Sequence, residues 1–253
     1  MNLGIKGKNV VITGASQGMG LEIAKLFSKE GASVTIISSN KKKLDRAFVL
    51  INKNKKGLKN YKILSDLTDN SELEIATNKI IKNKVPDIII HNIGGTLGVK
   101  SSLASYQDWL RVINFNVGIS IKINNRLIPL MKKNKYGHIV HVSSISAQSL
   151  RGSAPYGASK ALLNAYVQTL GRELATSGIV VSAVMPGAFT AKGGHWDKIK
   201  KNNPKMMRDF LRHHHAIGRL GEAKEIAPWI LFLCSRYSTF SVGTLVNVDG
   251  GTM

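Results

Sequence analysis

The 253-residue sequence has few acidic residues, one cysteine, six prolines and few aromatic side chains. The single Cys234 excludes an internal disulfide. Few prolines and an apolar fraction of 43% exclude a collagen-like, proline-rich or mostly disordered chain. No apolar run approaches the roughly 18 residues that span a bilayer, and residues 1–11 lack the apolar core of a signal peptide. We therefore expect a globular cytoplasmic protein that does not bind membranes.

Acidic residues are scarce enough, 15 against 36 Lys and Arg, to give a formal net charge of +21. Such a charge points first to polyanionic partners. Only 9 of the basic residues are Arg, which recognises phosphates and bases better than Lys does. The Lys excess is also spread over several segments (41–62, 79–84, 132–135 and 192–212). We predict that nucleic acid is not a partner.

Short β-branched runs alternate with amphipathic helical patterns along the whole chain. The predicted strands cover residues 9–13, 33–38, 61–65, 87–92, 138–143, 180–184 and 245–248, and the predicted helices cover 19–30, 42–53, 71–82, 158–175 and 223–235. Apolar strands of this kind suit a sheet covered by helices on both faces. The pattern predicts an α/β fold with a doubly wound parallel sheet (a Rossmann fold) in one domain, residues 1–253.

Residues 188–218 interrupt this alternation and are too long for a plain connection. Long insertions in compact domains often form lids over binding sites. A substrate lid and a pair of solvated surface helices are both compatible with the segment. It contains His213, His214 and His215, but no ligand partner at a suitable spacing, so we predict no metal site.

A glycine-rich turn follows the first predicted strand, with Gly14, Gly18 and Gly20 leading into a helix expected to begin near Leu21. Glycines at these points permit a tight turn and close approach of the backbone to a pyrophosphate. The helix N-terminus adds free N–H groups and the positive end of a dipole. The spacing differs from the commonest dinucleotide fingerprint, but its place between strand and helix favours nucleotide binding.

Tyr156 and Lys160 lie one turn apart if their segment is helical. A phenol with a pKa of about 10 is a poor base at neutral pH, and a neighbouring ammonium would favour the phenolate. Upstream, a predicted strand ends at Ser143 and Ser144, where a hydroxyl could hydrogen-bond a substrate carbonyl. Each of these signals is weak by itself.

Taken together and in this order, the motifs resemble those of the short-chain dehydrogenase/reductase family in its single-domain form of about 250 residues. The resemblance covers nearly the whole chain. Its motifs are residues 13–20, 66–68, 91–95, Asn116, Ser144, Tyr156 with Lys160, 186–187, 218–221 and 248–251.

The resemblance implies four catalytic residues. Tyr156 would be the general acid in reduction and the base in oxidation, and Lys160 would lower its pKa and bind the nicotinamide ribose hydroxyls. Ser144 would orient the substrate carbonyl. Asn116 would hold the water of a proton relay.

The sequence departs from the family pattern in several places. Ser144 precedes the tyrosine by twelve residues, one fewer than usual, whereas Ser143 keeps the usual count; the strand register favours Ser144 and leaves Ser143 as the alternative. Asn114 competes with Asn116, which the spacing from the preceding tryptophan selects. His91 replaces the first Asn of the family's Asn-Asn-Ala-Gly motif. We expect His138 and His141, on a predicted strand, to be packing or surface residues.

The resemblance also implies the cofactor contacts, which are Gly14, Ser16, Gln17, Gly18, Met19, Ser39, Asn40, Asp66, Leu67, Asn92, Gly94, Tyr156, Lys160, Pro186, Gly187 and Thr190. Residues 37–43 after the second strand contain no acid and several lysines, which favours the 2′-phosphate of NADP(H). The family's usual phosphate-binding Arg is absent at Ser39, so NAD(H) remains the alternative.

The expected function is hydride transfer between a nicotinamide and a small carbonyl or secondary alcohol. A 3-oxoacyl-thioester reductase fits the basic surface, and a sugar or polyol dehydrogenase fits a polar lid. A non-catalytic nucleotide-sensing or nucleic-acid-binding protein is the alternative from another class. The helix 158–175 carries apolar groups on more than one face, and together with the resemblance this implies a homotetramer or homodimer.

Overall fold

The computed structural model describes residues 1–53, 59–149, 152–191 and 194–252. In this part of the chain, seven parallel strands form one sheet in the order β3-β2-β1-β4-β5-β6-β9. They are β1 (Asn9–Thr13), β2 (Ser33–Ser38), β3 (Tyr61–Leu64), β4 (Ile88–His91), β5 (Gly137–Val142), β6 (Ile179–Pro186) and β9 (Thr244–Val248). The strand order reverses between β1 and β4, where open α/β sheets bind ligands. The predicted doubly wound sheet is confirmed.

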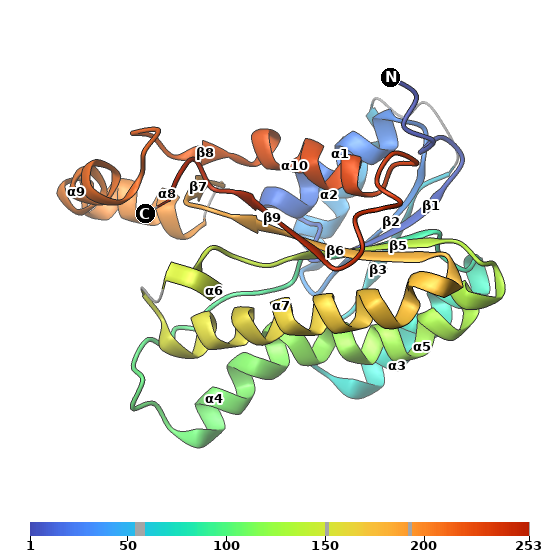
Figure 1. The fold of residues 1–253 in the computed structure, drawn as a ribbon, viewed down its shortest axis with the longest axis horizontal. Coiled ribbons are helices and arrows are strands. Elements are labelled where there is room, and N and C mark those ends of the chain that lie inside the picture. Colours follow the sequence, from blue (N-terminus) through green and yellow to red (C-terminus); the bar gives the residue numbers. More distant parts are fainter. Residues whose placement is uncertain (54–58, 150–151, 192–193, 253) are drawn as a thin grey trace.

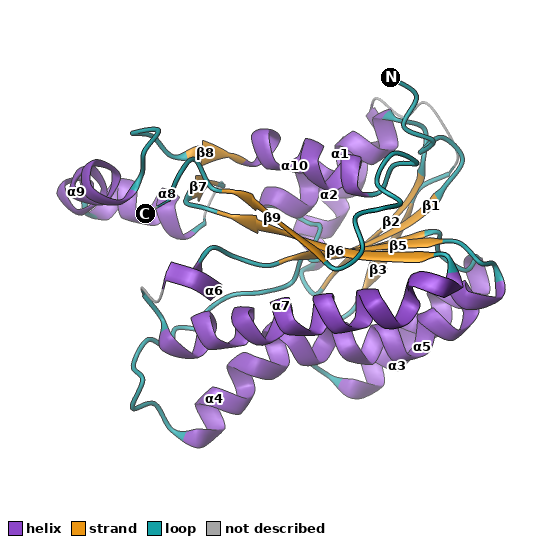
Figure 2. Cartoon of the chain, in the orientation of Figure 1, coloured by secondary structure: helices purple, strands orange, loops and turns teal. Residues whose placement is uncertain are grey.

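Helices cover both faces of the sheet (Figures 1 and 2). One layer contains α1 (Gly18–Lys29), α2 (Lys41–Lys53) and α10 (Ala223–Leu233), and the other contains α3 (Asn70–Asn83), α5 (Ile119–Lys133) and α7 (Ala154–Leu174). The short α4 (Tyr106–Ile113) lies beside α7 and leads through a π-helical turn, Asn114–Gly118, into α5.

The central strand β4 shows why both faces are covered. Ile88, Ile89 and Ile90 are each fully buried, although neighbouring side chains of a strand point to opposite faces. Ile88 and Ile90 belong to the core under α1 and α10, and Ile89 belongs to the core under α5 and α7. Burial of each such side chain stabilises the fold by about 1.5–3 kcal/mol, so the sheet holds both helical layers.

All seven predicted strands are present, with ends within two residues of those expected. The structure adds α4, the π-helical turn and α5 between β4 and β5, a region with no predicted helix. Pro129 lies inside α5, but Ile123, Leu127 and Met131 form a buried stripe along it. Tertiary packing of that stripe sustains the helix.

The segment 188–218 contains two helices, α8 (His195–Asn202) and α9 (Pro204–His214), at one end of the molecule (Figure 1). They pack through Trp196 and Phe210, whose ring centroids are 4.2 Å apart. A two-stranded parallel sheet of β7 (Phe189–Thr190) and β8 (Gly221–Glu222) joins the two ends of the segment. Residues 192–193 lie outside the described residues. The helix pair is thus observed, and its action as a lid stays a prediction.

Within the described residues, no helix is both long and apolar enough to cross a membrane.

Candidate active site

The glycine-rich turn connects β1 to α1 at the carboxyl edge of the sheet. Gly14 and Gly18 have φ angles of +65° and +57°, a region that favours glycine. A Cβ on Gly20 would lie 2.6 Å from both the Gly14 carbonyl oxygen and the Asn92 side-chain nitrogen. Helix α1 begins at Gly18 rather than near Leu21. The first backbone N–H groups of α1 therefore point out of the turn itself, as anion binding requires.

Asn92, directly after β4, fastens this turn to the next strand. Its side-chain amide donates to the carbonyl oxygens of Thr13 (3.3 Å) and Gly14 (3.0 Å), and its backbone N–H donates to the Thr13 hydroxyl (3.1 Å). The conformation of the glycine turn thus depends on a residue about eighty positions away. Asn92, a predicted cofactor contact, therefore also holds the turn that would bind the cofactor.

The turn after β2 lies beside the glycine turn. The Ser38 hydroxyl donates to the Ser16 hydroxyl at 2.8 Å. Ser39 and Asn40 are exposed, and the Asn40 side-chain oxygen accepts from the Lys43 backbone N–H at 2.9 Å, which caps the start of α2. The turn between β2 and α2 therefore presents neutral hydroxyl and amide groups and the N-terminus of a helix.

Two predicted cofactor contacts have buried side chains. Met19 is 5% exposed and Leu67 is 4% exposed, and each packs in one of the two cores. Only the backbone of these residues is available to a ligand. Asp66 is exposed and accepts from both the hydroxyl (2.7 Å) and the backbone N–H (3.0 Å) of Thr68.

Tyr156 and Lys160 lie in the first turns of α7. The helix is capped by the Ser153 hydroxyl, which accepts from the Tyr156 backbone N–H and donates to the Val99 carbonyl at 2.6 Å. The Lys160 ammonium donates to the Val142 carbonyl oxygen at 2.9 Å and lies 5.7 Å from the centroid of the Tyr156 ring. Contacts from both the helix and β5 therefore fix the pair.

The two serines after β5 point in different directions. Ser144 forms a side-chain hydrogen bond with Tyr156. The Ser143 hydroxyl instead donates to the Asn164 side-chain oxygen at 2.6 Å, inside the protein. The structure thus brings Ser144, and not Ser143, to the tyrosine.

Asn116 lies in the π-helical turn and is buried. Its side-chain oxygen accepts from the Gly95 N–H, and its side-chain nitrogen donates to the carbonyls of Gly95 and Val112, all at 2.8–2.9 Å. Asn114, the competing residue, instead accepts from the Lys122 ammonium at 3.4 Å. A π-helical turn often marks a functional position.

Gly94 separates the side chains of Asn116 and Lys160. A Cβ at Gly94 would lie 2.8 Å from both the Asn116 side-chain oxygen and the Lys160 ammonium. The absence of that Cβ lets the exposed backbone of residue 94 approach the cluster closely. Tyr156, Lys160, Ser144 and Asn116, which are scattered over 45 positions of the sequence, are thereby gathered at the carboxyl edge of the sheet.

Burial controls the charges of this cluster. It lowers the pKa of Lys160 to about 7, because the ammonium loses its hydration. It also raises the pKa of Tyr156, and the hydrogen bond with Ser144 opposes this only in part. The sequence led us to expect an ammonium that lowers the tyrosine pKa. That effect stays a prediction; burial raises the pKa of Tyr156, and its phenol is therefore protonated at neutral pH.

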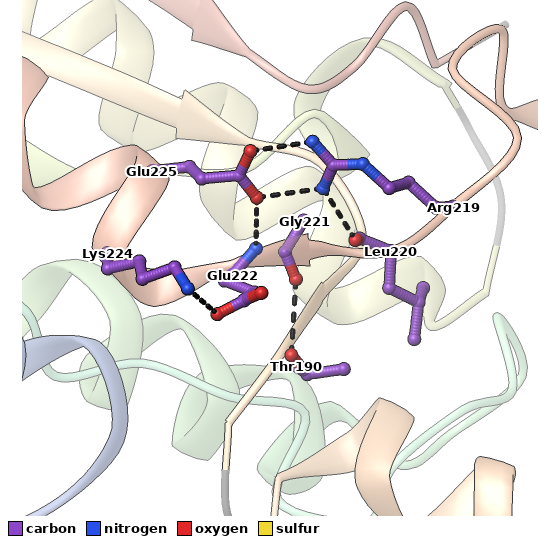
Figure 3. Close-up of polar contacts among 7 residues, drawn as sticks. All are labelled: Thr190, Arg219, Leu220, Gly221, Glu222, Lys224 and Glu225. Atoms are coloured by element: carbon purple, nitrogen blue, oxygen red, sulfur yellow. Dashed lines mark hydrogen bonds and ion pairs between the residues drawn. The ribbon is translucent and has the colours of Figure 1, made fainter.

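The carboxyl end of β6 completes the edge. A Cβ on Gly187 would lie 2.5–2.9 Å from backbone atoms of Asp249, so only glycine fits beside β9. The Thr190 hydroxyl donates to the Gly221 carbonyl at 3.2 Å, between β7 and β8 (Figure 3). Figure 3 also shows the Arg219 guanidinium paired with both oxygens of Glu225. The two hydrogen bonds, of 2.7 and 2.9 Å, fix the start of α10.

A family model described as enoyl-(acyl carrier protein) reductase matches residues 14–253. The 3-oxoacyl-[acyl-carrier-protein] reductase of Rickettsia felis is 32% identical over 250 residues, which is 98% of each chain. The chain belongs to the short-chain dehydrogenase/reductase family. The corresponding reductase of Thermotoga maritima is 31% identical over 251 residues, also 98% of each chain.

Solved structures agree with this assignment. L-sorbose reductase from Gluconobacter frateurii, complexed with NADPH and L-sorbose, superposes with a TM-score of 0.92 and 27% identity over 100% of this chain and 98% of that one. A 7α-hydroxysteroid dehydrogenase complexed with NADH superposes with a TM-score of 0.89 and 29% identity, over 100% and 96%. The predicted family and enzyme class are confirmed: this short-chain dehydrogenase/reductase is an NAD(P)-dependent oxidoreductase of carbonyl and CH–OH groups.

The residues present fit a nicotinamide dinucleotide. The glycines at 14, 18 and 20 leave the start of α1 open to a pyrophosphate, and Gly94 and Gly187 keep two further strand ends free of side chains. The described residues include no group of three His, Cys, Asp or Glu side chains that could hold a metal ion. His91 and His141, which no sequence motif marks as site residues, line a cavity next to Asn116.

Proposed function

We propose that the protein is an NADPH-dependent reductase of 3-oxoacyl thioesters, with Asn116, Ser144, Tyr156 and Lys160 as its catalytic residues. The observation that carries the proposal is a chain of contacts at one edge of the sheet. Asn116 and Lys160 both lie against the exposed backbone of Gly94, Lys160 lies beside the Tyr156 ring, and Tyr156 hydrogen-bonds with Ser144. The similarity to two 3-oxoacyl-[acyl-carrier-protein] reductases over nearly the whole chain supports the substrate class.

The chemistry follows from the state of each side chain. When bound, the reduced nicotinamide supplies a hydride to the carbonyl carbon. Tyr156, which is protonated at neutral pH, donates its phenolic proton to the carbonyl oxygen as the charge on that oxygen develops. Ser144 hydrogen-bonds with the phenol and is placed to donate to the same oxygen, which stabilises the developing charge.

Lys160 would then restore the proton. With a pKa of about 7, its ammonium can lose a proton at neutral pH more readily than an exposed lysine. The Val142 carbonyl holds the ammonium in place. Asn116, locked by Gly95 and Val112, would hold the water through which the proton is replaced.

Replacement of Tyr156 with Phe tests this assignment. We expect Tyr156→Phe to lower the turnover of a 3-oxoacyl thioester about 10²- to 10⁴-fold, because the acid is lost. NADPH binding, followed by its fluorescence, should be retained. Tyr136→Phe, a tyrosine before β5 and away from the site, is the control and should keep turnover. Wild-type activity in Tyr156→Phe would contradict the proposed role.

The dinucleotide would contact the residues that line this edge. We assign to it Gly14, Ser16, Gln17, Gly18, Met19, Ser39, Asn40, Asp66, Leu67, Asn92, Gly94, Tyr156, Lys160, Pro186, Gly187 and Thr190. Met19 and Leu67 would act through their backbone, because their side chains lie in the cores.

Preference for NADP(H) is supported by the charges after β2. Ser39 and Asn40 are neutral, and Lys42 and Lys43 follow them in the first turn of α2. Lys41 pairs with Asp45 at 2.8 Å, whereas the described residues include no ion pair of Lys42 or Lys43. Kinetics with both cofactors test the preference: we expect a higher kcat/KM with NADPH, and a tenfold preference for NADH would overturn it.

A sugar reductase is the second candidate, supported by the superposition with L-sorbose reductase. The two candidates differ in substrate length and polarity. An NADPH-oxidation screen with acetoacetyl-coenzyme A, ketohexoses and simple ketones separates them. A kcat/KM for the thioester at least tenfold above that for every ketohexose supports the first candidate, and the reverse order supports the second.

A homotetramer is supported by exposed apolar side chains on two surfaces. Trp229 and Phe232 on α10 are 48% and 40% exposed, and Leu162 on α7 is 48% exposed. Such groups mark contact surfaces when they cluster. Sedimentation of the purified protein tests this, with a dimer as the alternative. The cytoplasmic location and the absence of nucleic-acid binding stay predictions.

A further inference from the structure

A small, partly open cavity lies next to Asn116, where the ends of β1, β4 and β5 meet the π-helical turn. The space in it that is open to the centre of a water molecule has a volume of about 10 Å³. Its polar lining comes from Thr13, His91, Asn116, Ser120 and His141, and the rest of the lining is apolar. None of the proposed catalytic steps uses the two histidines.

His91 and His141 form a buried pair across two neighbouring strands. They are in register on β4 and β5, they are 4% and 0% exposed, and their rings stack with centroids 4.6 Å apart. The Nε2 atom of His91 lies 2.8 Å from the side-chain oxygen of Asn124. The side-chain nitrogen of Asn124 donates to the Tyr166 hydroxyl. An amide oxygen only accepts, so His91 carries its proton on Nε2 and its Nδ1 is a free acceptor.

The remaining ring nitrogens of the pair have no partner among the described residues. These atoms are His91 Nδ1 and both Nδ1 and Nε2 of His141. A buried polar atom without a hydrogen bond destabilises a protein, because it has lost its hydration and gained no partner. A neutral His141 has one N–H donor and one acceptor nitrogen, and a single water can pair with one of them. The side chains of Thr13 and Ser120 line the same cavity.

The cavity has the size and polarity of a water site. About 10–15 Å³ of such room is the least that admits one water, and a buried water needs two to four polar partners. The imidazole nitrogens without a partner meet this need, and the Ser120 hydroxyl, which donates to the Val117 carbonyl at 2.8 Å, can still accept from the water. We propose that the cavity binds one water between the His91–His141 pair and the π-helical turn of Asn116, and that the pair is thereby a positioning unit for Asn116 and Lys160.

The pair holds both halves of the site through its neighbours in sequence. His91 precedes Asn92, which fastens the glycine turn, and His141 precedes Val142, whose carbonyl accepts from Lys160. A water between the pair and residues 114–118 also fixes the turn that presents Asn116. Loss of the water would loosen these contacts together.

The charges around the pair fit a neutral unit. Asn124 faces it from α5, and Tyr166 and Lys160 approach it from α7. Burial lowers the pKa of His91 to about 4 and that of His141 well below its usual value, and Lys160 lowers the latter further. The pair is uncharged at neutral pH, so it does not repel the ammonium of Lys160.

A pair of phenylalanine variants tests the proposal. Only the kinetic measurement below rests on the proposed function. His141→Phe keeps the ring stack and removes both nitrogens. His138→Phe is the matched control, because His138 is equally buried on β5 but hydrogen-bonds the Leu233 carbonyl, on the opposite face of the sheet. His141→Gln keeps a polar group and serves if the Phe variant does not fold.

The first measurement is a high-resolution crystal structure of each variant. We expect one ordered water within hydrogen-bond distance of His91 Nδ1 in the wild type and in His138→Phe, and no such water in His141→Phe. An empty cavity in the wild type overturns the proposal. This result does not depend on the substrate, so it stands even if no carbonyl compound is turned over.

The second measurement is the pH dependence of kcat with NADPH. In His141→Phe we expect kcat to fall about tenfold or more, because Asn116 and Lys160 are misplaced. The alkaline limb of its pH profile of kcat should move to lower pH, because Lys160 loses polar surroundings. His138→Phe should keep the wild-type limb, and His141→Gln should restore it in part. Equal limbs in His141→Phe and His138→Phe would show a packing role only and would overturn the positioning role.

Discussion

Replacement of Lys160 with Met should stabilise the folded protein at neutral pH while it abolishes catalysis. The burial of Lys160 lowers its pKa from 10.5 to about 7. This difference, at 1.36 kcal/mol per pH unit, corresponds to about 5 kcal/mol. A methionine of similar shape removes that term but loses the hydrogen bond to Val142, which is worth about 1–3 kcal/mol. The net gain at pH 7 is about 2–4 kcal/mol.

The sign of this effect depends on pH. Between pH 7 and 10.5 the unfolded chain holds the Lys160 proton and the folded chain does not, so this group makes the wild type more stable as pH rises. Lys160→Met lacks the group. Its advantage over the wild type should therefore be largest at or below pH 7 and should disappear as the pH approaches 10.

Urea unfolding of both proteins without nucleotide, at several pH values from 6 to 10, measures this difference. The difference between the two proteins cancels all other titrating groups. Lys79→Met, at an exposed position of α3, is the control and should change the free energy of unfolding by less than about 0.5 kcal/mol at each pH. A difference between wild type and Lys160→Met that does not change with pH would refute the reasoning.

Three further outcomes are expected. Gly94→Ala should fold but lose about 10²-fold in kcat, because its Cβ would displace the two polar side chains that lie 2.8 Å away; unfolding and kinetic measurements check this. Ser144→Ala should lower kcat far more than its stability, whereas Ser143→Ala, which loses the bond to Asn164, should lower stability with little change in kcat. The wild type should lose up to about 3 kcal/mol of stability from His138 alone between pH 6.5 and 4, since its folded pKa is about 4. His138→Phe should remove that part of the acid sensitivity, and an unchanged acid transition would contradict this.

The glycine turn and the strands were predictable because local chemistry specifies them. Gly14 and Gly18 adopt positive φ, and Ile88–Ile90 can be buried only between two helical layers. The helix α5 was not predicted, since Pro129 obscures its pattern and its buried stripe becomes visible only against the sheet. The spacing in sequence could favour Ser144 over Ser143, but only the direction of each hydroxyl separates them in space.

The sequence by itself determined the fold class, the family and the residue types at the candidate site, because strand periodicity, turn glycines and motif order are properties of the chain. Only the tertiary structure decided the protonation states and the neighbours. Burial, which no local pattern specifies, raises the pKa of Tyr156 and lowers the pKa of Lys160. The sheet pairs His91 with His141, fifty residues apart in the sequence, because two strands come into register only when the sheet forms.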